Sequence, residues 1–339
     1  MLHEALESPK VVAAQLAENA PVRTLVDVLA ANPCQVVLTV ARGSSDHAAS
    51  YFSYLAISRL GIPVVSLPMS IATLQKAPFR VKGQLALAFS QSGKSPDLVA
   101  TMGALRAAGA RTAAAVNVTP SPLAEICEWQ IPLLAGAELS VAATKSYIAM
   151  LSISAQIVAY WERSLSGDEA LSDALAALPG NLHEAVKLDW TAGLDVLRGV
   201  EKMIVVGRGT GLAVAQEAAL KFKETSGIQA EAFSGAELRH GPMEIIGSQY
   251  PILVFAPRGP EQAGLIQLAE YMRARGAKVL LAAPTAIAGA NLPILETAHP
   301  ALDPIAAALS FYTMAAELAV NRGRNPDTPL YLQKVTETF

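Results

Sequence analysis

The sequence predicts an α/β protein that contains two copies of one parallel-sheet unit. Apolar, β-rich runs alternate with segments of helical length and period, which is typical of this fold class. The runs QVVLTVARGSS (35–45) and EKMIVVGRGTG (201–211) have the same shape, and glycine punctuation recurs at a constant spacing after each of them. Matching punctuation in the same order indicates an internal duplication.

The spacing between the two copies is 166 residues, the distance from Arg42 to Arg208. It pairs Arg42-Gly43 with Arg208-Gly209, Gly61-Ile62 with Gly227-Ile228, Phe89 with Phe255, and Gly93 with Gly259. A spacing of 167 residues pairs Gly109-Ala110 with Gly276-Ala277, and an apolar run follows each pair.

The first copy shows the order of elements that we expect in both. The sequence predicts strands near 35–41, 63–67, 84–89 and 111–117, with helices over 45–60 and 96–108. Continuous apolar runs of this kind suit a parallel sheet that helices cover on both faces. Pro21 and Pro96 suit the first turn of a helix, and Ser95 is a candidate N-cap.

Helices are also predicted over residues 143–198, which join the copies, with a break at Pro179-Gly180. The tail after Arg324 lacks periodicity, and its prolines argue against a helix. We therefore expect an N-terminal arm or helix, a first domain, linking helices, a second domain and an irregular C-terminal tail, at 1–20, 21–165, 166–198, 199–324 and 325–339.

Composition excludes several classes of protein. The 339 residues are 52% hydrophobic with a net charge of −3, which is too apolar and too weakly charged for a disordered chain. No block of like charge suggests nucleic acid or an anionic membrane as a partner. The longest apolar stretch (146–161) is too short for a bilayer span, and the first ten residues lack the apolar segment of a signal peptide. Cys34 and Cys127 form no zinc or disulfide pattern, so we expect a cytoplasmic protein without metal or cofactor.

Hydroxyl groups are concentrated in two loops of the first copy. Arg42-Gly43-Ser44-Ser45 follows the first predicted strand, and Ser90-Gln91-Ser92-Gly93-Lys94-Ser95 follows the third. Loops at the carboxyl ends of parallel strands meet helix N-termini, where amide groups favour a phosphate. Such loops can also be simple turns. The second copy has APRGPE (256–261) at the equivalent place, without a hydroxyl group, which favours a site in one copy only.

The second concentration of polar residues is ALKFKETSGIQAEAFSGAELRHGP (219–242). On a helix Lys221 and Glu224 share a face, as do Lys221 and Thr225, and two lysines beside one glutamate would keep a carboxylate base ionised. A solvated charged face is the alternative. His240 before a Gly-Pro break is either a catalytic imidazole or a structural cap. Because Walker A and dinucleotide patterns are absent, a small phosphorylated metabolite is the better ligand.

In this order, the motifs ARGSSDHA, SQSGKSPD, AELSVAATKSY, KFKETSGIQAEAFSGAELRHGP and LQKVTETF resemble the tandem sugar-isomerase (SIS) domain family, in particular the isomerase half of glucosamine–fructose-6-phosphate aminotransferase. The resemblance covers nearly the whole chain. It implies two flavodoxin-like SIS domains, a homodimer and a hexose 6-phosphate ligand.

The resemblance also implies roles for individual residues. Ser45, Ser90, Gln91, Ser92 and Ser95 resemble the phosphate-binding set, while Gly43, Ser44, Val141 and Ala142 resemble residues that contact the sugar chain. Glu224 matches the family's proton-shuttling base, with Lys221 beside it. His240 matches a ring-opening histidine that the neighbouring subunit supplies, and Lys334 matches a tail lysine that reaches the carbonyl end of the sugar.

The departures from the family pattern bear on the reaction. The aminotransferase of this family carries a glutaminase domain with an N-terminal cysteine. This sequence shows neither, so we do not expect synthesis from glutamine. Arg42, Lys94 and Ala143 differ from the residues that are usual at these positions in the family. These differences bear on which sugar the protein binds.

The stand-alone architecture resembles the second type of glucosamine-6-phosphate deaminase, which forms fructose 6-phosphate and ammonia. The first alternative is an enzyme of the same class, a deaminase, deglycase or isomerase that acts on another amino sugar such as galactosamine 6-phosphate or on a fructosamine 6-phosphate. The others are a sugar-phosphate sensor without turnover and a purely structural protein.

Overall fold

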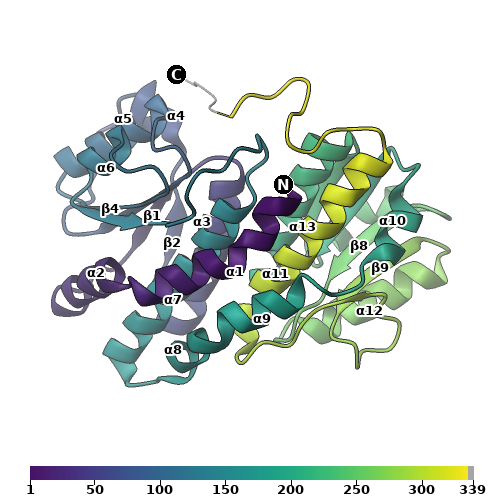
Figure 1. Cartoon of the computed structure of the whole chain (residues 1–339). Coiled ribbons are helices and arrows are strands. Elements are labelled where there is room, and N and C mark those ends of the chain that lie inside the picture. The colour runs from purple at the N-terminus through teal and green to yellow at the C-terminus, as the bar shows by residue number, and fades with distance from the viewer. Residues whose placement is uncertain (335–339) are drawn as a thin grey trace. The chain divides into compact units, whose positions relative to one another are not determined.

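The computed structural model describes residues 1–334, and these form two five-stranded parallel sheets with helices around them (Figure 1). Most of the closing motif LQKVTETF, from Val335 to Phe339, lies outside the described residues. The chain divides into two compact units. The first unit contains Lys10–Glu138, Lys145–Ala176 and, from the tail, Gln333 and Lys334. The second unit contains Met1–Pro9, Leu139–Thr144 and Ala177–Leu332.

The sheet of the first unit has the strand order β2-β1-β3-β4-β5 and is entirely parallel. Its strands are β1 (Val37–Val40), β2 (Val64–Ser66), β3 (Leu85–Ser90), β4 (Arg111–Val116) and β5 (Trp129–Pro132). The helical elements are α2 (Ala20–Ala31), α3 (Ser44–Leu55), η1 (Ala56–Leu60), α4 (Met69–Thr73), α5 (Pro96–Ala107), α6 (Pro122–Ile126), α7 (Lys145–Ser166), α8 (Ala170–Ala174) and, up to Ala176, η2 (Leu175–Ala177). Helix α1 (Leu2–Ala17) contributes residues to both units.

The second sheet repeats the same order as β7-β6-β8-β9-β10, again entirely parallel. Its strands are β6 (Lys202–Gly207), β7 (Gln229–Ser234), β8 (Pro251–Phe255), β9 (Lys278–Ala283) and β10 (Leu292–Pro293). The helical elements are α9 (Leu178–Ala185), α10 (Thr191–Leu197), α11 (Thr210–Lys221), η3 (Phe222–Ser226), η4 (Glu237–His240), η5 (Pro242–Ile245), α12 (Gln262–Ala274), η6 (Pro300–Leu302) and α13 (Asp303–Asn321). Both sheets therefore have the flavodoxin-like order.

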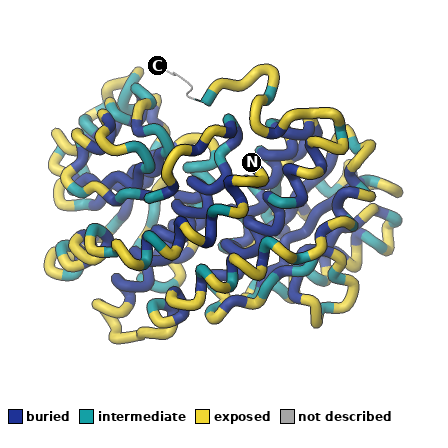
Figure 2. The backbone as a smooth tube through the Cα atoms, in the orientation of Figure 1, coloured by how far each residue is buried: buried dark blue, intermediate teal, exposed yellow. Residues whose placement is uncertain are grey.

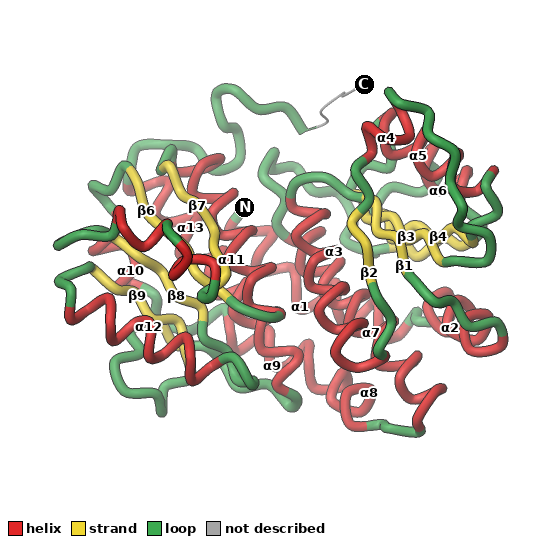
Figure 3. Tube along the Cα trace, turned by 180° about the vertical axis from the view of Figure 1, so that it is seen from behind, coloured by secondary structure: helices red, strands yellow, loops and turns green. Residues whose placement is uncertain are grey.

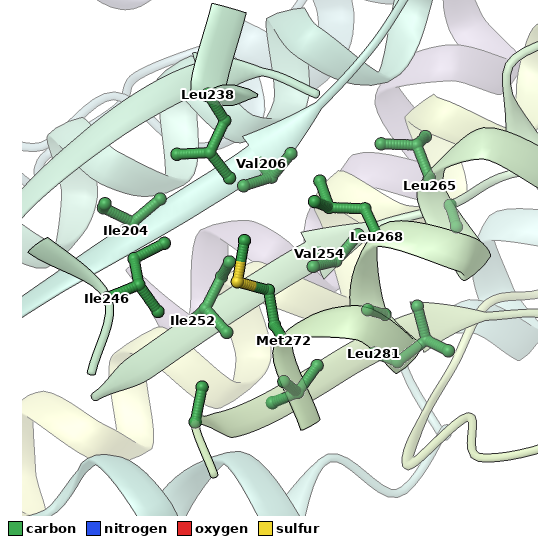
Figure 4. Packing of buried hydrophobic residues seen from close by; sticks show 14 of the residues in the cluster. Ile204, Val206, Leu238, Ile246, Ile252, Val254, Leu265, Leu268, Met272 and Leu281 are labelled. Carbon is green, nitrogen blue, oxygen red and sulfur yellow. The ribbon is translucent and has the colours of Figure 1, made fainter. Parts of the chain in front are cut away.

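Helices cover both faces of each sheet (Figure 3). In the first unit, α5 and α6 pack on one face through a cluster that includes Leu98, Met102 and Leu123, while α3 contacts the other. In the second unit, α12 packs on one face through Leu265, Leu268 and Met272 (Figure 4). Alternate strand residues point to the opposite face, where Phe255 contacts Phe311 of α13.

The strands are apolar runs because both of their faces are buried. Every residue of β3 and β8 is buried, whereas the edge strand β2 is mostly exposed. Figure 2 shows the buried residues concentrated in the strands and in the helix faces that cover them. None of the helices described within residues 1–334 combines the length and the apolar character that crossing a bilayer requires.

The duplication extends to backbone detail. Helix α3 ends in the π-helical turn η1 and helix α11 in the π-helical turn η3, and a left-handed glycine closes each turn, Gly61 at φ 68° and Gly227 at φ 63°. Gly43 and Gly209, which precede the two helices, also share their dihedral angles. The predicted pair of helix-flanked parallel sheets is confirmed.

One local prediction needs correction, one is confirmed in position only, and one strand is missed. Helix α9 begins at Leu178, so Pro179 lies in its first turn and Gly180 inside the helix. Proline is tolerated in a first turn because the N–H that it lacks has no partner there. The predicted break at Pro179-Gly180 therefore lies earlier, before Leu178. Ser95 occupies the N-cap position of α5, but its side chain accepts no capping bond. The sequence analysis misses strand β5, because this strand is only four residues long and only partly apolar.

Candidate functional site

The two hydroxyl-rich loops of the first unit meet at one edge of its sheet. Strands β1 and β3 are parallel neighbours, and β1 ends at Val40, opposite Ala88 and two residues before β3 ends at Ser90, so the loops that follow them are adjacent. They enclose a cavity of about 320 Å³. The cavity is lined by Arg42, Gly43, Ser45, Phe89, Ser90, Gln91, Ser92, Ser95, Leu98 and Lys334. We call this cavity the cradle; it contains the entire predicted phosphate-binding set, but Ser44 does not line it.

Hydrogen bonds within the loop after β3 hold its hydroxyl groups in place. Ser90 Oγ accepts a bond from the Gly93 amide at 3.0 Å, and Ser92 Oγ accepts one from the Lys94 amide at 3.2 Å. Each hydroxyl keeps its own proton for a ligand. The cradle also lies at the N-termini of α3 and α5, whose dipoles favour negative charge, although carbonyl and carboxylate acceptors already occupy most of the first amides there. Such a site suits an anion with several oxygens.

Gly93 is required by the shape of this loop. Its φ is +65°, and a β-carbon there would lie 2.2 Å from Ser121 Oγ and 2.9 Å from Val116 Cγ2. We expect Gly93→Ala to displace the loop and to weaken binding of inorganic phosphate, measured by calorimetry, by about tenfold or more. Gly83→Ala is the matched control, because Gly83 has φ +75° but open space around it. Equal phosphate affinity in the two variants would contradict this role of Gly93.

Two cations line the cradle, and a buried carboxylate holds each of them. Arg42 Nε and Nη2 donate to Asp97 Oδ2 at 3.1 and 3.0 Å. Lys334 Nζ donates to Glu138 Oε2 at 2.9 Å, and Glu138 also accepts bonds from the amide and the hydroxyl of Ser146. The positive charge near an anion therefore comes from side chains that the fold orients.

The second copy closes the equivalent place with its own side chains. Arg258, which corresponds to Ser92, forms an ion pair with Asp303 and donates to the Thr297 carbonyl at 2.6 Å. Glu261, which corresponds to Ser95, places its carboxylate beside Gly209: a β-carbon on that glycine would lie 2.6 Å from Glu261 Oε1. A carboxylate of the protein thus occupies the start of α11. This supports the prediction that only the first copy offers an anion site.

The second unit contains a buried lysine between two glutamates. Lys221 is fully buried at the end of α11, 3.2 Å from Glu217 Oε1 and 2.5 Å from Glu224 Oε2. Tyr312 of α13 donates to Glu217 Oε1 at 2.8 Å. Burial alone would lower the pKa of Lys221, but the charges of Glu217 and Glu224 outweigh it and raise that pKa. The lysine is therefore an ammonium ion in a buried three-residue cluster.

Glu224 is the member of this cluster that a ligand can reach. It lies in η3, and its side chain is 20% exposed, against 1% for Glu217. The expectation of two lysines beside Glu224 needs correction, because Lys223 points to solvent. In the first copy the positions equivalent to this cluster hold Tyr51, Leu55 and Ser58, so the fold does not require the charges.

Sequence reasoning missed Glu217 and Tyr312. Glu217 lies four residues before Lys221 on the same helix, a spacing that predicts contact. Tyr312 carries no local signal, because it is 95 residues away from its partner.

The other predicted residues of the second unit lie on loops and short turns. His240 ends η4 and is exposed, next to Gly241 with φ 146°. Val141 donates its amide to the Asp327 carbonyl at 3.0 Å, and Ala142 is buried. The predicted residues thus form two clusters. The cradle, with Lys334, lies in the first unit, and the Lys221–Glu224 pair lies in the second unit. His240, Val141 and Ala142 belong to the second unit but not to that pair.

Glu4 anchors the loop that carries Val141 and Ala142. Its Oε1 accepts bonds from the amides of Leu139 at 2.6 Å and Ser140 at 3.0 Å, and the α-ammonium group of Met1 lies 3.4 Å from Oε2. Ser140 Oγ donates in turn to Asp327 Oδ1 at 2.7 Å. The loop is therefore joined to α1 and to the start of the C-terminal tail.

Glu4→Ala should release this loop. We expect amide hydrogen exchange at Leu139 and Ser140 to accelerate by roughly tenfold or more, because each amide loses its acceptor. Glu4→Gln keeps an acceptor oxygen and should change exchange less. Glu7→Ala, a half-buried glutamate on the same helix, is the control. Unchanged exchange at both amides in Glu4→Ala would refute the anchoring role.

The same anchor should depend on pH. Burial alone would raise the pKa of Glu4, but bonds from Ser140 and Leu139 and the Met1 ammonium outweigh it and lower that pKa below 4.5. A lowered folded-state pKa means that the anchor stabilises the fold above about pH 4.5 and is lost as the pH falls further.

A larger cavity of about 710 Å³ lies in the second unit beside α10 and α13. No predicted site residue lines it, and its charged side chains, among them His3, Asp189 and Glu317, are exposed. The cradle has oriented polar groups at its base and is the better candidate for a ligand site.

Comparison with known proteins agrees with this architecture. The model of the SIS domain family matches residues 33–160 and 196–318, and the chain belongs to that family. The glutamine–fructose-6-phosphate aminotransferase (isomerizing) of Zymomonas mobilis is 30% identical over 314 residues, which cover 88% of this chain and 51% of that protein. The chain thus spans about half the length of the curated relatives it matches.

Solved structures have the same fold. A provisionally assigned phosphosugar isomerase from Silicibacter pomeroyi DSS-3 is 39% identical with a TM-score of 0.91, over 96% of this chain and 99% of that one. A glucosamine-6-phosphate deaminase from Thermotoga maritima has a TM-score of 0.72 over 98% of this chain and 100% of that one. Its identity of 21% shows a shared fold alone.

Proposed function

We propose that this protein converts glucosamine 6-phosphate and water into fructose 6-phosphate and ammonia. The observation that carries the proposal is that two copies of one fold bear different polar clusters. The first copy has the cradle, and the second copy has Lys221 with its two glutamates. The second copy lacks the hydroxyl groups of the cradle, and the first copy lacks the charged residues of the Lys221 cluster. Groups that the fold does not require are best explained by a ligand and a reaction.

The cradle would hold the phosphate group of the substrate. Ser45, Ser90, Ser92 and Ser95 supply hydroxyl groups, and the dipoles of α3 and α5 favour the negative charge. The names of the Zymomonas and Silicibacter proteins both refer to phosphorylated sugars, which supports this assignment.

Glu224 would act as the base of the reaction. After His240 assists ring opening, Glu224 takes the C2 proton of the open-chain aldehyde, and an enol-type intermediate forms between C1 and C2. Glu224 returns the proton to C1, which leaves an imine at C2. Water then hydrolyses the imine to the ketone and ammonia. General base catalysis of this kind contributes about 10²–10⁴ in rate.

The remaining groups would stabilise charge. Amides of the loop around Ala142 would donate to O1 as negative charge develops there, since Lys334 lines the cradle and the Val141 amide already donates to the Asp327 carbonyl. Lys221 holds Glu224 through Oε2, which leaves Oε1 to receive the proton. The proposed steps need only water as the second reactant.

The test compares glucosamine 6-phosphate with galactosamine 6-phosphate on the purified protein and measures ammonia and ketose together. Equal amounts of the two products from glucosamine 6-phosphate would support the proposal. Faster release of ammonia from galactosamine 6-phosphate would show that this epimer is the substrate of the deaminase. Binding of either sugar without product would refute catalysis and favour a sensor.

His240 provides a test of the proposed homodimer. If the neighbouring subunit supplies it, Glu224→Gln and His240→Asn chains, each inactive alone, should regain activity when they are unfolded and refolded together. A mixed dimer would then contain one complete site and recover roughly a quarter of wild-type activity. No recovery, with mixed dimers shown by mass spectrometry, would place His240 and Glu224 of one chain in the same site.

A further inference from the structure

Arg42 differs from the other groups of the cradle, because it is the only guanidinium among its lining residues. It lies two residues after the end of β1 and directly precedes Gly43, the N-cap residue of α3. Its side chain is 59% exposed and reaches the first turn of α5, where it pairs with Asp97. An exposed arginine that lines a cavity of hydroxyl groups is well placed to meet an entering anion.

The orientation of Arg42 is set by a carboxylate that cannot turn. Asp97 is 2% exposed, and its Oδ1 accepts the Leu98 amide at 2.8 Å, which leaves Oδ2 for both bonds from Arg42. These bonds use Nε and Nη2. Within residues 1–334 the Nη1 group has no hydrogen-bond partner, so one edge of the guanidinium remains for a ligand.

The second copy shows what the pair adds. Its equivalent arginine, Arg208, is retained and exposed, but the position of Asp97 is taken by Ala263. The copy that lacks the hydroxyl groups therefore also lacks the carboxylate that orients the arginine. The oriented arginine occurs together with the cavity, which links it to a ligand and not to the fold.

We propose that Arg42, oriented by Asp97, is a specificity-determining residue that makes the cradle select a doubly charged phosphate ester over a singly charged ester of the same shape. This inference rests on the proposed phosphate-binding role of the cradle. Hydroxyl and amide groups bind either ester, whereas a guanidinium gains most from the additional negative charge and from two oxygens that match its planar fork. Asp97 acts as a positioning residue, since it is buried behind the arginine.

The test uses glucose 6-phosphate and glucose 6-sulfate, which differ in charge but hardly in shape, with calorimetry at pH 8. The wild-type protein should bind the phosphate ester more tightly. Arg42→Gln should weaken phosphate-ester binding by roughly 10- to 100-fold and sulfate-ester binding by less than about threefold. Arg42→Lys should recover part of the preference, because it keeps the charge and loses the fork. Arg208→Gln is the matched control and should change neither affinity.

Several outcomes would overturn the inference. Equal losses for both esters in Arg42→Gln would show a general effect, and no loss for either would show that Arg42 does not contact the anion. If Arg42→Gln unfolds because Asp97 is left unpaired, Arg42→Lys decides the matter: a preference equal to that of wild type refutes the need for the fork. Failure of wild-type protein to bind either ester would refute the cradle as well. Deamination with an unchanged KM in Arg42→Gln would refute the role of Arg42 alone.

Discussion

Glu224→Gln is expected to lower ammonia release from glucosamine 6-phosphate by about 10²–10⁴. The amide cannot accept the C2 proton, but it keeps the size of the side chain and can still meet Lys221, which lies 2.5 Å from Glu224 Oε2. Fructose 6-phosphate should therefore bind with nearly unchanged affinity. Turnover and product binding measured on the same preparation separate the two effects, because only the chemical step needs the carboxylate.

Glu270→Gln is the control for this variant. Glu270 is an exposed glutamate on α12 of the same unit and belongs to no predicted site. It should retain wild-type turnover. Glu224→Gln with near-wild-type turnover would exclude Glu224 as the proton carrier, and a parallel loss of product binding would indicate that Glu224 only shapes the site.

Lys221→Met is expected to reduce the free energy of unfolding by about 3–5 kcal/mol. Lys221 is fully buried, and Glu217 beside it is 1% exposed, so removal of the ammonium leaves a buried carboxylate without its counter-charge. The bond from Tyr312 to Glu217 compensates only part of this charge. Chemical denaturation monitored by circular dichroism measures the loss.

Lys223→Met is the matched control, since this lysine lies two residues further along and points to solvent. It should change the free energy of unfolding by less than about 0.5 kcal/mol. Addition of Glu217→Gln to Lys221→Met should recover part of the loss, because the double variant no longer buries that charge. Similar stabilities for Lys221→Met and Lys223→Met would contradict the buried cluster.

The two copies show how one fold carries two different polar clusters. Both present the same strand order and the same glycine-started helix, and they differ in the side chains at the loops and helix ends. In the first copy serines leave room for an anion, whereas in the second Glu261 and Arg258 occupy the equivalent place. The duplicated backbone supplies positions, and the local residues decide what each position does.

Local patterns in the sequence were sufficient to predict the duplication, the strands β1 to β4 and both hydroxyl-rich loops. These features depend on short-range signals, namely apolar runs, glycines at positive φ and residues three or four apart on a helix. The contact between Lys221 and Glu224 follows from such a spacing and is present in the structure.

Only the tertiary structure decided which charged groups are paired. Arg42 meets Asp97 across 55 residues, Lys334 meets Glu138 across 196, and Glu4 meets the amide of Ser140 across 136. Nothing local marks these partners, because each pair forms where the fold brings distant segments together and buries the carboxylate. Burial also determined that Lys221 and not Lys223 accompanies Glu224, since the two lysines point to opposite sides of one helical turn.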